Sequence, residues 1–228
     1  MKRIVNFGFG LYIAFVFAIA GNAIADDCPL CTAVFEGDVL AVNRLIANSP
    51  NLNVLHDLNA PHDKNGETVL MKAARGERVE IVKVLLSAGA NLKATDKNGI
   101  NSLMLVSGKS IVNLQPLISI SPTDDLLGEG LLKIWAEGKI KRLWAKQVST
   151  MKVLLEAASP KDINALDNSG WTALMYAAKI GSANATRLLI NHGADVNLAN
   201  ADGWTALDIA EEVGDRGVAR ILRKAGAE

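Results

Sequence analysis

The chain repeats itself with a period of 33 residues, and this period restricts what it can fold into. The segment 63–70 recurs as 96–103, and the segment 167–174 recurs as 200–207. A fixed period of this size is typical of a solenoid, in which each structural unit packs only on its neighbours. Because a solenoid presents a long surface rather than a closed pocket, the period favours binding over catalysis.

The residues inside one period predict two short helices and a turn. An Asp or Asn opens the turn, and a Gly three residues later supplies a backbone conformation that other residues resist. Thr68, Thr172 and Thr205 then stand where a helix N-cap is expected. Pairs of alanines follow in the first helix, an apolar run such as 81–86 forms the second, and a Gly ends it.

This unit resembles the ankyrin repeat. Alignment on the N-cap position places five units, and these begin near residues 27, 63, 96, 167 and 200. The N-cap positions themselves are Cys28, Thr68, Asn101, Thr172 and Thr205. The third unit carries about 38 extra residues and the first about 7, relative to the period of the family. The resemblance implies an all-α solenoid of about five helix-turn-helix units, and the residues over about 109–146 predict a helical insertion in the third unit.

The first 25 residues are interpreted as a secretory signal peptide rather than as part of the fold. Lys2 and Arg3 precede an uncharged, mostly apolar stretch, and Ala23-Ile24-Ala25 has the small-x-small pattern of a cleavage site. We therefore expect an ankyrin-repeat domain over 26–228 that is exported after cleavage near Ala25, into the periplasm of a Gram-negative bacterium.

The charge of the chain argues against a nucleic-acid partner. The whole sequence has 24 basic and 24 acidic residues, and removal of Lys2 and Arg3 leaves 22 against 24, a formal charge of −2. This balance gives no bulk attraction to nucleic acid or to an anionic membrane.

The two cysteines form a Cys-x-x-Cys pair at the start of the first unit. In register with the ankyrin repeat, Cys28 takes the position of the usual Thr and Cys31 that of the usual His, with Pro29 at the first helical position. We expect a structural disulfide, because export leads to oxidising conditions. A redox-active pair and a metal site remain as alternatives; a complete zinc site would need more ligands than this pair.

The insertion contains a second candidate for binding. Its segment 126–147 is predicted to be largely helical, carries a basic bias, and includes Trp135 and Trp144. Such a helix could bind a partner groove or a membrane surface. The favoured alternative is that both Trp side chains cover neighbouring repeats, with the lysines in solvent.

The resemblance also implies a binding face made of turn tips and the exposed side of the first helices. Trp171 and Trp204 are one repeat apart, so we expect them to be neighbours on this face, unless each packs over its own turn. The residues predicted to contact a partner, including those of the insertion, are Lys64, Asn65, Glu67, Arg75, Lys97, Asn98, Ile100, Trp135, Trp144, Asn168, Ser169, Trp171, Lys179, Ile180, Asp202 and Trp204.

No motif of an enzyme is recognised in the sequence, and no cofactor or metal is expected. His56 and His62 bracket the enlarged loop of the first unit, where a weak metal site is conceivable but solvated side chains are the simpler interpretation. We therefore predict a monomeric, non-enzymatic module that binds an unidentified protein partner. The alternatives are a redox accessory factor that uses Cys28 and Cys31, and a membrane-associated scaffold that uses 126–147.

Overall fold

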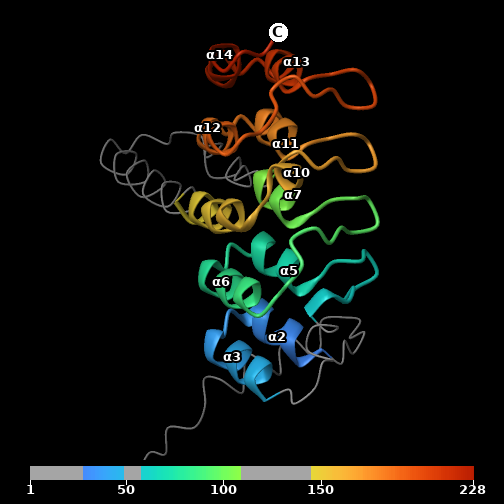
Figure 1. Cartoon of the computed structure of the whole chain (residues 1–228), viewed down its shortest axis with the longest axis vertical. Coiled ribbons are helices and arrows are strands. Elements are labelled where there is room, and N and C mark those ends of the chain that lie inside the picture. The colour runs from blue at the N-terminus through green and yellow to red at the C-terminus, as the bar shows by residue number, and fades with distance from the viewer. Residues whose placement is uncertain (1–27, 49–57, 109–144) are drawn as a thin grey trace, which may run out of the picture.

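The computed structural model describes residues 28–48, 58–108 and 145–228, and within them the protein is a stack of helix pairs (Figure 1). The predicted signal peptide, His56 and most of the insertion, with Trp135 and Trp144, lie outside these residues. Within the described ranges there is no strand, and a single isolated bridge joins Ala199 to Thr205. None of the helices described is both long enough and apolar enough to cross a membrane.

The helices form two layers. The inner layer contains α2 (Pro29–Glu36), α5 (Val69–Arg75), α7 (Ser102–Ser107), α11 (Ala173–Lys179) and α13 (Ala206–Glu212). The outer layer contains α3 (Val39–Ala47), α6 (Val79–Ser87), a helix over 145–157, α12 (Ala183–Asn191) and α14 (Arg216–Lys224). A short helix, α10 (Pro160–Ile163), precedes the turn of the fourth unit. Each inner helix contacts the next one along the stack, so neighbouring units share one continuous core.

The inner helices begin where the sequence predicts a cap. The Thr68, Thr172 and Thr205 hydroxyls accept hydrogen bonds from the backbone N–H three residues on, at 3.2–3.3 Å. Asn101 caps α7 in the same way at 2.9 Å, and the Cys28 sulfur caps α2 at 3.0 Å. Because these bonds satisfy N–H groups that the helix leaves unpaired, the caps determine where each short helix starts.

The core between the two layers is made of residues that recur with the period. The leucine two positions after each of the last four caps is buried, at 7% exposure or less. The alanines of α5 and α11 are fully buried, and their small size lets adjacent helices approach closely. These leucines are Leu70, Leu103, Leu174 and Leu207, and the alanines are Ala73, Ala74, Ala177 and Ala178.

A row of asparagines joins neighbouring units at the ends of the outer helices. Asn164 donates to the carbonyl of Gly193 at 3.1 Å and accepts from the Asp195 N–H at 2.8 Å. Asn197 contacts Gly226 and Glu228 one unit later in the same way, at 3.4 and 3.2 Å. These side chains therefore satisfy backbone groups that the end of an outer helix leaves unpaired.

The third unit has the same two-layer arrangement as its neighbours, although its two helices are separated by 109–144. Gln147 of the outer helix is buried and donates from Nε2 to the Val106 carbonyl of α7 at 2.8 Å. Residues 145–150 are already helical, so this helix begins before Met151, where the apolar pattern resumes. The extra residues thus interrupt the chain between the two helices and leave their packing intact.

The cap of α13 predicts how the stability of the last unit depends on pH. Hydrogen bonds from the Thr205 backbone N–H and hydroxyl, both at 2.7 Å, hold the pKa of the Asp208 carboxyl below its usual range. A lowered pKa in the folded state means that the stabilisation is present above about pH 4 and is lost as the pH falls through the lowered value. We expect melting temperature to fall more steeply toward acid in the wild type than in Asp208→Asn. Asp202→Asn, at the exposed tip of the same unit, is the control; parallel profiles for the wild type and Asp208→Asn would contradict the prediction.

Candidate partner-binding surface

Four turns of one design project from the inner layer, and we call them together the finger row: residues 63–68, 96–101, 167–172 and 200–205 (Figure 1). In each turn the first residue uses its side-chain Oδ1 to accept two backbone N–H groups, two and four positions on, at 2.8–3.0 Å. These first residues are Asp63, Asp96, Asp167 and Asn200. The side chain therefore closes the turn, as expected for Asp and Asn in tight turns.

Backbone hydrogen bonds join the four fingers into one continuous edge. The Lys97 N–H donates to the Asn65 carbonyl at 3.0 Å, and the Ala201 N–H donates to the Ser169 carbonyl at 3.1 Å. The same bond joins Asn168 to Asn98 at 2.9 Å, although these residues are 70 apart in the sequence. The insertion therefore does not break the finger row, and the tips are held at regular spacing.

Most of the predicted contact residues of the described chain lie at the surface. Ile100, Trp171 and Ile180 are half-buried, and Glu67 is buried. The exposed ones are Lys64, Asn65, Arg75, Lys97, Asn98, Asn168, Ser169, Lys179, Asp202 and Trp204. The Asn168 side chain also donates to the Lys97 carbonyl at 3.0 Å, so it helps to join two fingers as well as facing solvent.

Glu67 was expected to contact a partner, but its side chain is buried and paired. Its side chain is only 5% exposed, and its Oε1 accepts a hydrogen bond from Nη2 of Arg75 on α5. Arg75 itself is half-exposed. A buried carboxylate requires a partner of opposite charge, and this pair supplies it. Glu67 therefore holds the guanidinium of Arg75 beside the finger row instead of contacting a partner directly.

Trp171 is packed within its own unit. Its ring lies 5.3 Å from the ring of Tyr176, and the Lys179 ammonium lies 4.9 Å from its centre. The Tyr176 hydroxyl donates to Asp167 Oδ2 at 2.7 Å, which connects this cluster to the base of its finger. Burial, together with that hydrogen bond, raises the pKa of Tyr176. Of the two positions expected for Trp171, the structure has the one in which its ring packs within its own unit.

Trp204 occupies a more open position at the last finger. Trp204 is 41% exposed, whereas Trp171 is half-buried. The Trp204 backbone N–H donates to the Asn200 side chain, and its carbonyl accepts from the Asn200 backbone N–H. A rigid aromatic side chain of this kind is a frequent anchor in protein interfaces, because it buries a large area at little entropic cost. Trp204 is thus the strongest anchor candidate in the described part of the finger row.

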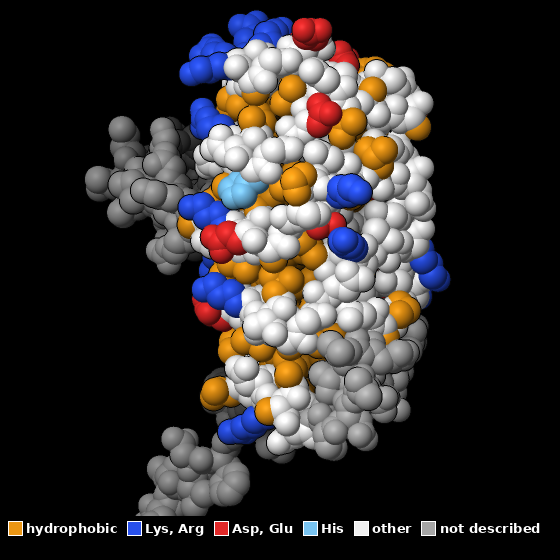
Figure 2. Space-filling model, in the orientation of Figure 1, with side chains coloured by type: hydrophobic (Ala, Val, Ile, Leu, Met, Phe, Trp, Pro, Cys, Tyr) orange, Lys and Arg blue, Asp and Glu red, His pale blue; other side chains and the backbone are white. Residues whose placement is uncertain are grey.

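The distribution of charge differs between the two sides of the molecule. Lys and Arg side chains gather along the outer-helix side and at the C-terminal end in the view of Figure 2. The C-terminal group comes from α14, which is polar and basic in its last turn and buries only Val218, Ala219 and Leu222. Such a helix is suited to closing the end of a solenoid.

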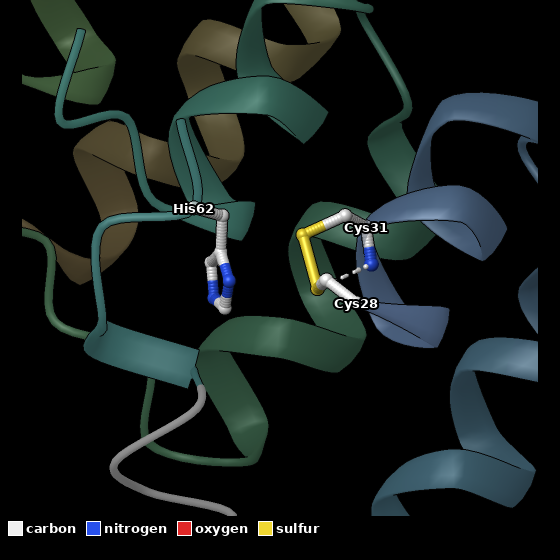
Figure 3. Close-up of side chains that lie close together, drawn as sticks. All are labelled: Cys28, Cys31 and His62. Carbon is white, nitrogen blue, oxygen red and sulfur yellow. Dashed lines mark hydrogen bonds between the residues drawn. A yellow bond between two sulfur atoms is a disulfide. The ribbon is translucent and has the colours of Figure 1, made fainter. Parts of the chain in front are cut away.

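The cysteines and one histidine form a second cluster, away from the finger tips. Cys28 and Cys31 are in disulfide contact, with their Cα atoms 5.2 Å apart, and the His62 ring lies beside them (Figure 3). One ligand atom of each residue lies within 4.8 Å of the other two. The sequence indicated the cysteine pair but not the approach of His62, which is separated from it by the enlarged loop.

Two layers of paired helices with a row of projecting turns define the class of helical-repeat solenoids. The family model of ankyrin repeats matches residues 15–114 and 143–228. The chain therefore belongs to the ankyrin-repeat family, as its sequence pattern predicted. Ankyrin repeats generally act as protein–protein interaction modules.

Similar proteins include inversin and a Notch protein. Inversin of Mus musculus is 30% identical over 179 residues, which cover 75% of this chain and 15% of inversin. Neurogenic locus notch homolog protein 2 of Homo sapiens is 26% identical over 159 residues, 65% of this chain and 6% of that protein. The 2-5A-dependent ribonuclease of Mus musculus is 38% identical over 78 residues, 34% of this chain and 10% of that protein. The chain thus spans only a small part of the length of these relatives.

Proposed function

We propose that this protein is an exported, monomeric, non-enzymatic module that binds one protein partner in the periplasm, chiefly through the finger row. The observation that carries the proposal is the continuous edge of fingers, in which backbone hydrogen bonds hold exposed side chains at regular spacing. A surface that is already ordered loses little conformational freedom on binding, so more of the contact energy appears as affinity. Trp204, Arg75 and Lys179 are its principal contact residues, and the insertion with Trp135 and Trp144 adds specificity.

A crosslinked pull-down from the native exported fraction tests this proposal. The baits are the protein over 26–228 and a variant in which a short Gly-Ser linker replaces 109–144, a boundary that retains Gln147 and its bond to α7. Both are first checked for folding by circular dichroism. If the partner is captured only by the bait with the insertion, the insertion determines specificity. If both baits capture the partner, the finger row determines specificity. If neither bait captures a specific partner, the binding function is wrong.

The export part of the proposal has its own test. It rests on Lys2, Arg3 and the Ala23-Ile24-Ala25 pattern, all outside the described residues. We expect the intact mass of the protein from the exported fraction to correspond to a chain starting at Asp26, with two hydrogen atoms fewer than the dithiol because Cys28 and Cys31 are joined. A chain that retains residues 1–25 would contradict export by cleavage, and two free thiols would contradict the structural disulfide.

A redox accessory role is the second candidate, and the position of His62 beside the cysteine pair favours it. A histidine beside a cysteine pair is a recurring feature of reactive cysteine sites. Replacing both cysteines by serine separates the two functions, because a binding module retains its partner whereas a redox factor loses activity. The membrane-scaffold alternative depends on 126–147, of which 126–144 lie outside the described residues, and flotation of the protein with anionic vesicles tests it.

A further inference from the structure

Three side chains with metal-binding donor atoms converge where the first unit meets the second. Cys28 is the N-cap of α2 and Cys31 lies in its first turn, and His62 precedes the first finger by one residue (Figure 3). The two sulfur atoms and a ring nitrogen of His62 all lie within 4.8 Å of one another. Cys28 and His62 are half-buried and Cys31 is buried, so the cluster is sheltered but reachable from solvent.

The protein backbone holds these donors in place. The His62 N–H donates to the Glu67 carbonyl at 2.9 Å, which ties the histidine to the first finger. Lys72 of α5 donates to the His62 carbonyl at 3.5 Å, and α5 packs directly on α2. The histidine and the cysteines are therefore attached to two helices in contact, and the cluster is formed by the stacking of the first two units.

The donor atoms of the cluster indicate which ions suit it. The Cys31 N–H donates to the Cys28 sulfur at 3.0 Å, at the N-terminus of an eight-residue helix. Two thiolates and one imidazole form a donor set that suits thiophilic d10 cations, namely Cu⁺ and Zn²⁺.

We propose that Cys28, Cys31 and His62, when the cysteines are reduced, bind a single thiophilic d10 cation, Cu⁺ or Zn²⁺. Binding displaces the two thiol protons into solvent and forms two metal–sulfur bonds and one metal–nitrogen bond. Ligand atoms around a tetrahedral zinc lie about 3.5–3.8 Å apart, given Zn–S and Zn–N bonds of about 2.3 and 2.0–2.1 Å. Here the ligand atoms lie within 4.8 Å of one another with the two sulfur atoms joined, so metal binding requires the sulfur atoms to separate and the side chains to adjust over a short distance.

The disulfide and the metal-bound form are alternative states of the same side chains. Oxidation by an external disulfide joins the two sulfur atoms, and the two electrons and the two thiol protons pass to the external disulfide, which becomes two thiols. Neither sulfur is then available as a thiolate ligand. Metal occupancy is consequently linked to the redox state of the pair, and the linkage does not depend on whether the finger row binds a partner.

Metal titration of the mature protein tests the site. The protein over 26–228 is reduced with a phosphine under anaerobic conditions, then titrated in separate arms with Zn²⁺ alone against a chromophoric chelator and with Cu⁺ in competition with a Cu⁺ chelator. We expect one equivalent to bind in at least one arm, and the arm that succeeds identifies the cation. The oxidised protein, and the Cys28→Ser and Cys31→Ser variants, should lose this binding. No binding in either arm would overturn the proposal.

The histidine distinguishes this site from a simple dithiol chelate. His62→Asn should weaken metal binding by at least about a hundredfold. Removing a residue that orients a metal ligand can lower affinity by that factor, and removing the ligand itself should cost at least as much. His192→Asn, which removes a histidine at the end of α12, should bind like the wild type. Equal affinity of His62→Asn and wild type would overturn the assignment of His62. Protection of the two wild-type thiols from iodoacetamide by the bound cation provides a readout that needs no variant, and unprotected thiols would also overturn it.

Discussion

Replacing Gly170 by alanine is expected to destabilise the protein by about 3 kcal/mol, whereas Gly203→Ala should cost only about 1 kcal/mol. Both glycines close a finger and both have positive φ, 77° and 83°. An alanine in this conformation costs about 1–2 kcal/mol, part of which is offset by the smaller entropy of its unfolded chain. This shared contribution should be nearly the same at the two positions.

The difference arises from the contact between fingers. A Cβ atom on Gly170 would lie 2.7 Å from the Ala201 backbone nitrogen and 3.1 Å from the Asn200 carbonyl carbon. A Cβ atom on Gly203 would meet nothing within 4 Å, because no finger follows it in the described chain. Since the clash at Gly170 is with backbone, it can be relieved only by moving the fifth unit away, and overpacking of this kind costs about 1–3 kcal/mol.

Hydrogen exchange and thermal unfolding measure this effect together. We expect Gly170→Ala to lose protection at the Ala201 amide, which bonds to the Ser169 carbonyl at 3.1 Å, and Gly203→Ala to retain it. The melting temperature should fall further in Gly170→Ala. If the two variants are equally stable and equally protected, the close approach of the fingers contributes nothing, and a finger row held by backbone bonds is wrong.

The parts of this fold that could be predicted from sequence are those encoded within one period. Thr68, Thr172 and Thr205 each act through a backbone N–H three residues away, so their positions alone indicate where a helix starts. The same holds for the Asp and Asn residues that close each finger. The position of the insertion in the third unit could also be predicted, because the repeat pattern resumes after the insertion with the same spacing between turn and helix cap.

Contacts between periods could not be predicted in the same way. The ion pair of Glu67 with Arg75 connects a finger to the helix behind it, and the burial of Glu67 depends on how that helix packs. His62 approaches the cysteines across the enlarged loop of the first unit, whose length departs from the period. The asparagine contacts at the ends of the outer helices join residues about one period apart, as with Asn164 and Asp195, and no local pattern indicates them.

The two tryptophans of the finger row should respond oppositely to substitution. Trp204→Ala is expected to reduce capture of the partner by at least about tenfold while changing stability by only about 0.5 kcal/mol, because its side chain is 41% exposed. Trp171→Ala should instead destabilise the protein by about 2 kcal/mol, since it removes the ring contact with Tyr176 and the contact with the Lys179 ammonium.

Crosslinked capture from the exported fraction and thermal unfolding, measured on the same preparations, separate these outcomes. Ala201→Ser is the matched control for Trp204→Ala, because it changes an exposed residue of the same finger that is not among the predicted contacts and removes no aromatic ring. Unchanged capture by Trp204→Ala would exclude this ring as an anchor. The insertion would then be the part of the protein expected to select the partner. A loss of capture confined to Trp204→Ala would mean that the last finger, where no further finger follows in the described chain, contacts the partner most closely.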